Sequence, residues 1–496
     1  MLYTRYKVAD ISKLAVMLKD DTAIMKPEEL WNLNDEEFNK WRRENDLKRL
    51  FDCFQKTLPL FDEWLSTYNF SIDFILNTDK PGSFFYWDRE TILFKSNDNG
   101  FDHYFFVPIE DKAHDKRLKK VPEKEKEKVE QYRFKPYFIW AKEKLKSNKI
   151  IKTKYSGELD TFRYIGGTAP DVPEMCSATI SPGISVLKLG GTKINGWGLT
   201  TFRNLDFTNL DFLEIEGKHH WDREFNIFYS SCRHLKFNNS VINFTKFYAC
   251  HFEGLTSINS RFYWTEFYNC DFFGADFENS SLINFIIQDC SANRFSFNRV
   301  EVDNFIYLPP KNEWHTGIVG TYETVAENYK RFRVLFQNNG HRKEAGEAYY
   351  KERLYDLKYN FCSLSFKRAF KLFWKQDFNY AQPLLKENFS KLGSSISDFF
   401  SYLIWGFGER PLRTVLCSIV ILTIYTGLYF ISGIEIVGGN LTNSFYLSSI
   451  MFTTLGFGDF VPFQNGEYKL LLASEALLGA FTFGLFIASY ANKSKY

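Results

Sequence analysis

The stretch NLTNSFYLSSIMFTTLGFGDFVPFQNGEY, residues 440–468, separates two long apolar segments of the chain. Residues 414–433 (TVLCSIVILTIYTGLYFISG) carry no charge, and residues 470–492 carry one, Glu475. As helices that rise about 1.5 Å per residue, both segments are long enough to cross a hydrocarbon core of about 30 Å. We therefore expect two membrane-spanning helices, with residues 440–468 between them.

Residues 440–468 are too apolar for an ordinary external loop. The segment 442–453 is expected to form a short re-entrant helix that breaks at Thr-Thr-Leu-Gly-Phe-Gly-Asp, residues 453–459. Irregular backbone at membrane depth is tolerated where protein buries it or where it lines a water-filled cavity. Gly456 and Gly458 permit backbone angles that let successive carbonyl groups point the same way. Carbonyl oxygens arranged in rings can replace the hydration shell of a cation.

The basic residues around the two apolar segments predict the orientation. Arg410 and Arg413 precede the first segment, Lys493 and Lys495 follow the second, and residues 434–468 contain no Lys or Arg. Positively charged flanks stay on the cytoplasmic side of a membrane. We therefore expect the protein to lie in the cytoplasmic membrane, with both termini in the cytoplasm.

This region resembles the pore domain of potassium channels that have two membrane helices per subunit. Residues 453–459 match the family pattern T-T-[VIL]-G-[YF]-G-D at every position, and residues 479–485 match a G-x-x-x-F-G-L segment of the inner helix. The resemblance covers Arg410–Tyr496. It implies a homotetramer that conducts K⁺ as permeant ion, without any cofactor, because one loop supplies only a quarter of each cation site.

The resemblance also implies roles for individual residues. Backbone carbonyls and the Thr454 hydroxyl would form the stacked cation sites of a selectivity filter, Gly458 would provide a turn at its outer mouth, and Thr453 and Asp459 would support it. The carbonyls belong to Thr454, Leu455, Gly456 and Phe457.

Four residues of the second apolar segment are candidates for gating or for lining the cavity. Gly479 is either a hinge or a site of close helix packing. Phe483 and Ile487 lie on one helical face and would line the cavity or form a hydrophobic gate. Glu475 is the one ionisable group inside a span, so it either takes part in transport or is hydrogen-bonded behind the filter.

A second pattern repeats every five residues between about 199 and 302, which is neither the helical period nor the strand period. At most of the repeats, a small residue lies two positions before the apolar residue. The pattern resembles pentapeptide-repeat proteins, which implies a right-handed, four-sided β-helix at 180–305 with twenty residues per coil. The repeating apolar positions are Phe202, Phe207, Phe212, Phe237, Ile242, Phe247, Phe252, Phe262, Phe267, Phe272, Phe277, Leu282 and Ile287.

Further expectations follow from this resemblance. Cys250, Cys270 and Cys290 are expected to stack in one interior column as small core residues rather than as a metal or redox site. Residues 213–236, with His219 and His220, interrupt the pattern and are expected to bulge out as a loop. Residues 196–305 contain 14 Asp and Glu against 9 Lys and Arg. This is weak support for a DNA mimic, so a spacer or assembly module is favoured.

The remaining segments are expected to be cytosolic. Residues 306–408 read as a helical linker with an αα-hairpin at 321–358, and residues 330–375 carry 12 Lys and Arg against 4 Asp and Glu. This basic linker either contacts anionic lipid headgroups or presents an ordinary solvated face. Residues 1–155 read as an α+β region of unknown role, with helices at 36–67 and a β-hairpin that turns at 97–100.

The sequence thus predicts a multidomain chain: an α+β region at 1–155, a β-helix at 180–305, a helical linker at 306–408 and an α-helical pore domain at 409–496. The predicted function is a tetrameric, potassium-selective bacterial channel with an N-terminal cytosolic regulatory or assembly region. This region would gate the pore through residues 306–410 in response to an unknown ligand or protein partner. The alternative is a membrane-anchored scaffold whose β-helix recruits a partner while the pore does not conduct. We find no motif for enzyme activity, for a metal centre or for nucleic-acid binding.

Overall fold

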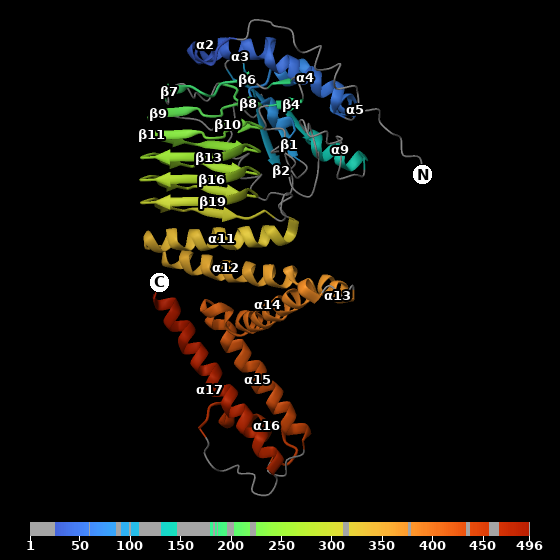
Figure 1. Ribbon diagram of the computed structural model, residues 1–496, viewed down its shortest axis with the longest axis vertical. Helices are drawn as coiled ribbons and strands as arrows, with labels where there is room; N and C mark the ends of the chain where they lie inside the picture. Colours follow the sequence, from blue (N-terminus) through green and yellow to red (C-terminus); the bar gives the residue numbers. More distant parts are fainter. Residues whose placement is uncertain are drawn as a thin grey trace, which may run out of the picture. The chain divides into compact units, whose positions relative to one another are not determined.

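A computed structural model of the chain describes residues 25–58, 60–85, 91–98, 101–108, 130–145, 179–181, 184–185, 187–195, 203–218, 225–310, 317–374, 378–432, 437–455 and 466–495. The chain forms two compact units, Met1–Gly317 and Ile318–Tyr496. Figure 1 shows the elements of each unit along the chain.

The first unit begins with short helices and a small antiparallel sheet. The expected helical segment 36–67 is confirmed, and so is the hairpin, whose strands pair from Thr91 with Pro108 to Asp98 with Phe101. Asn34 caps helix α3, because its side chain accepts a hydrogen bond from the Glu37 amide. The elements are α2 (Pro27–Asn32), α3 (Asp35–Glu44), α4 (Asp46–Thr57), α5 (Phe61–Thr67), α6 (Ile72–Leu76), a 3₁₀ turn η1 (Pro81–Phe84), β1 (Thr91–Asp98), β2 (Phe101–Pro108), β3 (Glu130–Phe134) and α9 (Tyr137–Leu145), with sheet order β2-β1-β3.

A β-solenoid of about five turns follows at residues 187–308, which confirms the predicted β-helix. Its strands pair in parallel with strands twenty residues further along, so that Phe247 faces Phe267, Phe267 faces Ile287, and Ile287 faces Tyr307. A short antiparallel pair, β4 (Thr179–Ser181) and β5 (Ile184–Ser185), precedes it. The solenoid strands are β6 (Leu187–Lys188), β7 (Lys193–Asn195), β8 (Thr208–Asn209), β9 (Glu214–Lys218), β10 (Phe225–Phe228), β11 (Lys236–Asn243), β12 (Thr245–Tyr248), β13 (His251–Ile258), β14 (Arg261–Tyr263), β15 (Glu266–Tyr268), β16 (Asp271–Glu278), β17 (Ser281–Ile283), β18 (Ile286–Gln288), β19 (Ser291–Asn298), β20 (Glu301–Asp303) and β21 (Ile306–Leu308).

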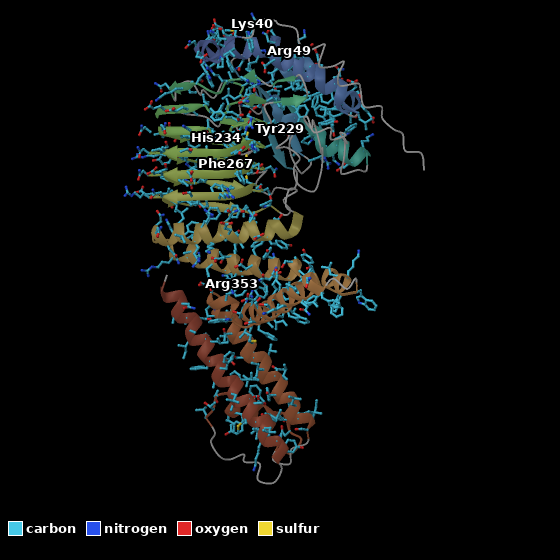
Figure 2. All side chains as sticks on the ribbon, in the orientation of Figure 1. Lys40, Arg49, Tyr229, His234, Phe267 and Arg353 are labelled. Atoms are coloured by element: carbon cyan, nitrogen blue, oxygen red, sulfur yellow. The ribbon has the colours of Figure 1, made fainter. Side chains whose placement is uncertain are left out.

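The five-residue rhythm arises at the corners of the solenoid. Every fifth residue from Tyr229 to Asn304 has a positive φ. Asparagine, aspartate and glycine occupy many of these corners, since they tolerate the left-handed conformation best. Between corners the apolar side chains point inward and stack, as Phe247 does on Phe267 with ring centroids 5.0 Å apart (Phe267 is labelled in Figure 2).

The expectation that residues 213–236 leave the solenoid as a loop is wrong for the described residues 213–218 and 225–236. Strands β9 and β10 lie within this segment, and Leu213, Ile215 and Phe225 are buried. Ile215 pairs with Phe237, twenty-two residues away, whereas Phe225 pairs with Thr245, twenty residues away. The pairing distance to the next coil therefore changes by two residues between β9 and β10, and both strands stay in the stack. His219 and His220 lie outside the described residues.

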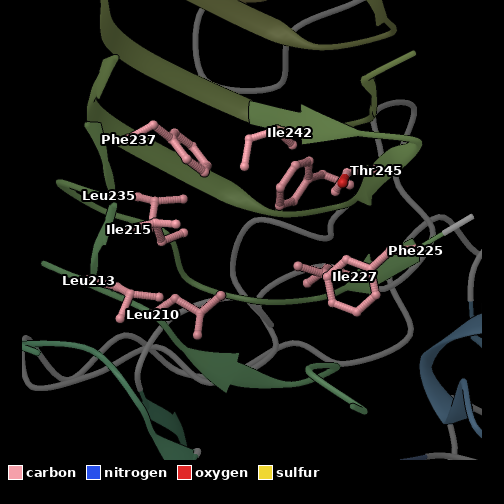
Figure 3. A pocket seen from close by; sticks show the side chains of 10 residues that line it. Leu210, Leu213, Ile215, Phe225, Ile227, Leu235, Phe237, Ile242 and Thr245 are labelled. Atoms are coloured by element: carbon pink, nitrogen blue, oxygen red, sulfur yellow. The ribbon is translucent and has the colours of Figure 1, made fainter. Parts of the chain in front are cut away.

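The interior of the solenoid is filled by small and apolar side chains. Cys250, Cys270 and Cys290 are buried in one column, as predicted, and the amide of Cys270 donates to the Cys290 sulfur at 3.3 Å. Burial raises the pKa of the Cys270 thiol well above its usual value, so the thiol is unreactive. An apolar cavity of about 10 Å³ between two coils (Figure 3) has room for about one water molecule and none for a larger ligand.

The N-terminal helices and the solenoid share one hydrophobic core. Phe51, Phe54 and Phe85 pack edge-on against Phe207, which stacks on Tyr229 with centroids 5.3 Å apart (Tyr229 is labelled in Figure 2). These helices also cover the first coil through polar contacts. The Trp31 indole donates to the Leu189 carbonyl at 2.9 Å, the Arg203 guanidinium donates to Asp35 at 2.8 Å, and the buried Arg42 donates to the Asn204 carbonyl at 2.5 Å. An open solenoid edge, which invites strand addition, is thereby closed.

The second unit consists of helices, and the predicted αα-hairpin, the predicted short helix between the apolar segments and the two apolar helices are present. Helix α11 packs on α12 through the Arg333–Glu352 ion pair at 2.9 Å and through Tyr329 stacked on Tyr355. Its elements are α11 (Gly317–Asn338), α12 (Arg342–Ser363), α13 (Phe366–Trp374), α14 (Phe378–Trp405), a 3₁₀ turn η3 (Gly406–Gly408), α15 (Pro411–Ile431), α16 (Leu441–Phe452) and α17 (Gly466–Lys495).

Candidate pore

Helices α15 and α17 are both long and apolar enough to cross a membrane, with mean hydropathies of 2.1 and 2.0, and most of their surface is not buried within the chain. The short helix α16 packs against both of them around a small core that contains Tyr429, Leu447, Ile450 and Leu472. An exposed apolar surface on a pair of long helices is what a bilayer or neighbouring subunits would cover.

The sequence of α16 sets both of its ends. Asn440 caps the start, because its side chain accepts the Thr442 amide at 2.8 Å. At the other end the Thr454 amide donates to the Met451 carbonyl and the Leu455 amide donates to the Ile450 carbonyl. These two bonds form a Schellman motif, in which a left-handed residue reverses the chain after the last helical turn.

Thr454 is the left-handed residue, with φ of 57°. A β-branched side chain is unfavourable in this conformation, at a cost of about 1–2 kcal/mol, so the surrounding structure must hold it in place. The helix therefore ends under backbone strain at the first residue of the predicted filter. Thr453, Thr454 and Leu455 are described, whereas Gly456, Phe457, Gly458 and Asp459 lie outside the described residues.

Gly479 lies where α17 crosses the end of α16. A Cβ atom on Gly479 would lie only 1.9 Å from the carbonyl oxygen of Phe452, the last residue of α16. A Cβ atom on Gly484 would meet nothing within 4 Å. Gly479 thus permits the close contact between the inner helix and the residues that lead into Thr453, which is the packing role considered from the sequence.

Glu475 connects α15, α16 and α17. Its side chain is fully buried, and its two carboxyl oxygens lie 2.5 Å from the Tyr429 hydroxyl of α15 and 2.5 Å from the Ser448 hydroxyl of α16. A second pair of hydroxyls, on Tyr425 and Ser474, joins α15 to α17 at 2.8 Å. We call Glu475, Tyr429 and Ser448 the clasp. In a single chain, the clasp corresponds to the hydrogen-bonded placement that the sequence left open for Glu475.

Phe483 and Ile487, the other gating candidates, are exposed on the single chain. Neither contacts the clasp or the end of α16 through any hydrogen bond or aromatic pair among the described residues. Their predicted place in the cavity depends on neighbouring copies, so it stays a prediction.

Sequence reasoning missed most of a polar joint at the start of α15. We call residues 405–413 the elbow. Arg413 donates to the Tyr402 carbonyl at 2.7 Å and to the Tyr350 hydroxyl of α12 at 3.0 Å, while Arg410 pairs with Glu347 of α12 at 2.5 Å. Burial raises the pKa of Tyr350 although Arg413 opposes the shift, so Tyr350 stays a neutral hydrogen-bonding group. The sequence does suggest that Trp405 and the Gly-Glu-Arg-Pro turn, residues 408–411, couple the linker to the first span, but it gave no sign of the partners on α12.

The elbow also meets the end of α17. Gly406, Phe407 and Gly408 all have positive φ, which turns the chain sharply from α14 into α15. A Cβ atom on Gly408 would lie 2.9 Å from the side-chain nitrogen of Asn492 near the end of α17. The elbow therefore touches α12 and both long apolar helices.

No group of three or more metal-ligating side chains occurs among the described residues.

A family model described as "Ion channel" matches residues 415–494, which include α16, the glycine-bearing segment and most of α15 and α17. A search of curated proteins gave no match. Residues 415–494, which contain two membrane-capable helices, are thus similar to ion-channel domains of the two-helix, potassium-channel type.

Proposed function

We propose that the protein is a potassium-selective channel formed by four copies of this chain. The observation that carries the proposal is the placement of Thr-Thr-Leu-Gly-Phe-Gly-Asp, residues 453–459, directly after the C-terminus of α16 and between α15 and α17. The carboxyl end of a helix carries a partial negative charge that favours a cation. Carbonyl oxygens from four such segments would replace the water around a dehydrated K⁺ ion.

In this proposal, Thr454, Leu455, Gly456 and Phe457 supply the cation ligands and Gly458 the outer turn. Thr453 and Asp459 support the filter from behind. Three features of the described residues next to the filter favour one fixed geometry for it. They are the Schellman motif at the end of α16, the contact at Gly479 and the clasp. Phe483 and Ile487 would face the cavity once four copies surround an axis.

The protein is proposed to lie in a cytoplasmic membrane with both termini in the cytoplasm, because the Lys and Arg residues flank the spans on that side. The proposed domains are the α+β region at 1–155, the solenoid at 180–305, the helical linker at 306–408 and the pore at 409–496. The solenoid would serve as a regulatory or assembly module.

The elbow supports a route for gating. Helix α12 holds Arg410 and Arg413, and the elbow touches Asn492 of the inner helix. A displacement of α12 caused by a ligand or protein partner would therefore reach both long apolar helices through one joint. Tyr350→Phe removes one hydrogen bond of this joint and should change the open probability while leaving the ratio of K⁺ to Na⁺ permeability unchanged.

The test is ion flux into liposomes that contain the purified full-length protein. Flux of K⁺, block by Ba²⁺ and loss of flux in Gly456→Asp are expected, with Gly427→Ala as the matched control because a Cβ there meets nothing within 4 Å. Equal passage of Na⁺ would reject potassium selectivity. A tetramer that passes no ion under any condition would favour the membrane-anchored scaffold instead.

A further inference from the structure

Helices α13 and α14 expose several large apolar side chains. Phe370, Phe373 and Trp374 on α13 are 51 %, 46 % and 85 % exposed. On α14, Phe389, Phe400 and Leu403 are 60 %, 53 % and 52 % exposed. We call these six residues the aromatic surface. An exposed apolar surface of this extent marks a contact with a partner or a membrane.

The two helices form one surface because they pack along each other. Phe366 of α13 lies edge-on against Phe389 of α14, with ring centroids 5.5 Å apart, and the Ser365 amide donates to the Asn388 side chain at 3.0 Å. Near the other end, Phe373 packs on Phe378 at 5.2 Å.

The rest of α14 is already occupied or is polar. Its side with Asn388 and Ser395 is buried, and Asp398 on that side pairs with Arg353 of α12 at 2.7 Å (Arg353 is labelled in Figure 2). Ser394 and Ser397 are exposed on another side. One face of α14 therefore contacts α12 and a second face is polar and exposed. The third face carries the aromatic surface, which the single chain leaves exposed.

The place of the aromatic surface in the second unit indicates what covers it. Helices α13 and α14 run crosswise at the end of the unit where α15 begins and α17 ends (Figure 1). The sharp elbow joins α14 directly to the first span. A helix that lies across the end of a membrane span is at the depth of the lipid headgroups.

The charge of this segment fits an anionic lipid surface. Residues 357–376 contain five Lys and Arg and no Asp or Glu. Aromatic side chains prefer the boundary between headgroups and acyl chains, and each Lys or Arg near an anionic leaflet strengthens binding.

We propose that the aromatic surface of α13 and α14 lies in the cytoplasmic leaflet of an anionic membrane. The pair would act as an interfacial support that fixes the elbow at the membrane boundary. The inference rests on the two spans and not on ion selectivity, so a pore that conducts no K⁺ would leave it intact.

The test measures the depth of nitroxide labels on the full-length protein in liposomes. Cysteine replaces Phe373 or Phe400 in a background whose accessible native cysteines are serine, and the matched control is Ser394→Cys on the exposed polar side. The liposomes contain phosphatidylethanolamine and phosphatidylglycerol, or phosphatidylcholine alone. Collisions with oxygen report lipid, and collisions with a water-soluble nickel chelate report water.

Labels at 373 and 400 are expected about 5–10 Å below the headgroup level, protected from nickel and open to oxygen, while the label at 394 stays open to nickel. In phosphatidylcholine, the label at 373 should move toward water. Nickel access at 373 and 400 equal to that at 394 would overturn the proposal. Protection from both reagents together with dipolar broadening between labels would also overturn it, because a second copy of the chain would then cover the surface.

Discussion

The contact at Gly479 gives the sharpest prediction, the effect of Gly479→Ala on ion flux. The added Cβ would lie 1.9 Å from the Phe452 carbonyl oxygen and 2.8 Å from its carbonyl carbon. Real Cβ atoms essentially never come within 3.0 Å of such atoms. The end of α16 must therefore retreat by more than about 1 Å, and a backbone carbonyl cannot swing aside as a side chain can.

The energy of the substitution has two parts. Alanine in place of glycine stabilises a helix by about 1 kcal/mol. Overpacking at a contact that cannot relax costs about 1–3 kcal/mol. The net penalty acts on the end of α16, which lies two residues before Thr454. We therefore expect K⁺ flux per tetramer to fall by roughly tenfold, together with weaker discrimination against Na⁺.

Flux into liposomes with matched amounts of tetramer measures this effect. Gly484→Ala and Gly427→Ala are the controls, since a Cβ at either position meets nothing within 4 Å in the single chain. Wild-type flux and selectivity in Gly479→Ala would refute the packing argument. A changed open probability with unchanged selectivity would instead support the hinge role.

Three further predictions concern other parts of the chain. Glu475→Ala should lower the thermal stability of the detergent-solubilised protein, because two buried hydroxyls lose their acceptor at a cost of about 1–3 kcal/mol each. The melting temperature of Glu475→Gln should stay close to that of the wild type. Equal melting temperatures of the two variants would contradict the clasp. Burial raises the pKa of Asp206 to about 6. The folded chain therefore keeps a proton that the unfolded chain loses, and the stability of the first unit should fall as the pH rises from about 4 to about 6, by about 3 kcal/mol at most. Hydrogen exchange of the full-length protein measures this slope, and Asp206→Asn should flatten it. Gly254→Ala should destabilise the solenoid more than Gly274→Ala, because both glycines have positive φ but only at Gly254 would a Cβ meet another side chain, at 2.6 Å from His234. Equal exchange protection in the two glycine variants would show that His234 moves aside.

The solenoid shows how far sequence patterning reaches. The twenty-residue coil, the cysteine column and the buried apolar positions from Phe237 to Ile287 follow from repetition alone, because every coil presents the same environment to the next. The predicted apolar position Phe212 was wrong, since it is a corner residue with positive φ and is 62 % exposed. The interruption at 213–236 was misread, because the pairing distance changes by two residues between β9 and β10 while both strands stay in the stack. The Asn-rich corners carried a further signal, since positive φ recurs at every fifth position.

The sequence by itself determined the elements whose cause is local. Uninterrupted apolar runs define the two spans, alternating glycines define the predicted filter, and the asparagine cap and the residues after Phe452 set the ends of α16. These features depend on residues close together in the chain, so composition and spacing are sufficient to predict them.

Only the tertiary structure decided which distant residues meet. Glu475 bonds to a tyrosine 46 positions away and Arg413 to one 63 positions away, and no spacing rule links them. Whether Gly479 meets a backbone carbonyl, and which side of α14 is left uncovered, depends on how helices cross. Crossing geometry arises from the packing of many side chains at once, and that is why the clasp, the elbow and the aromatic surface were visible only in the folded chain.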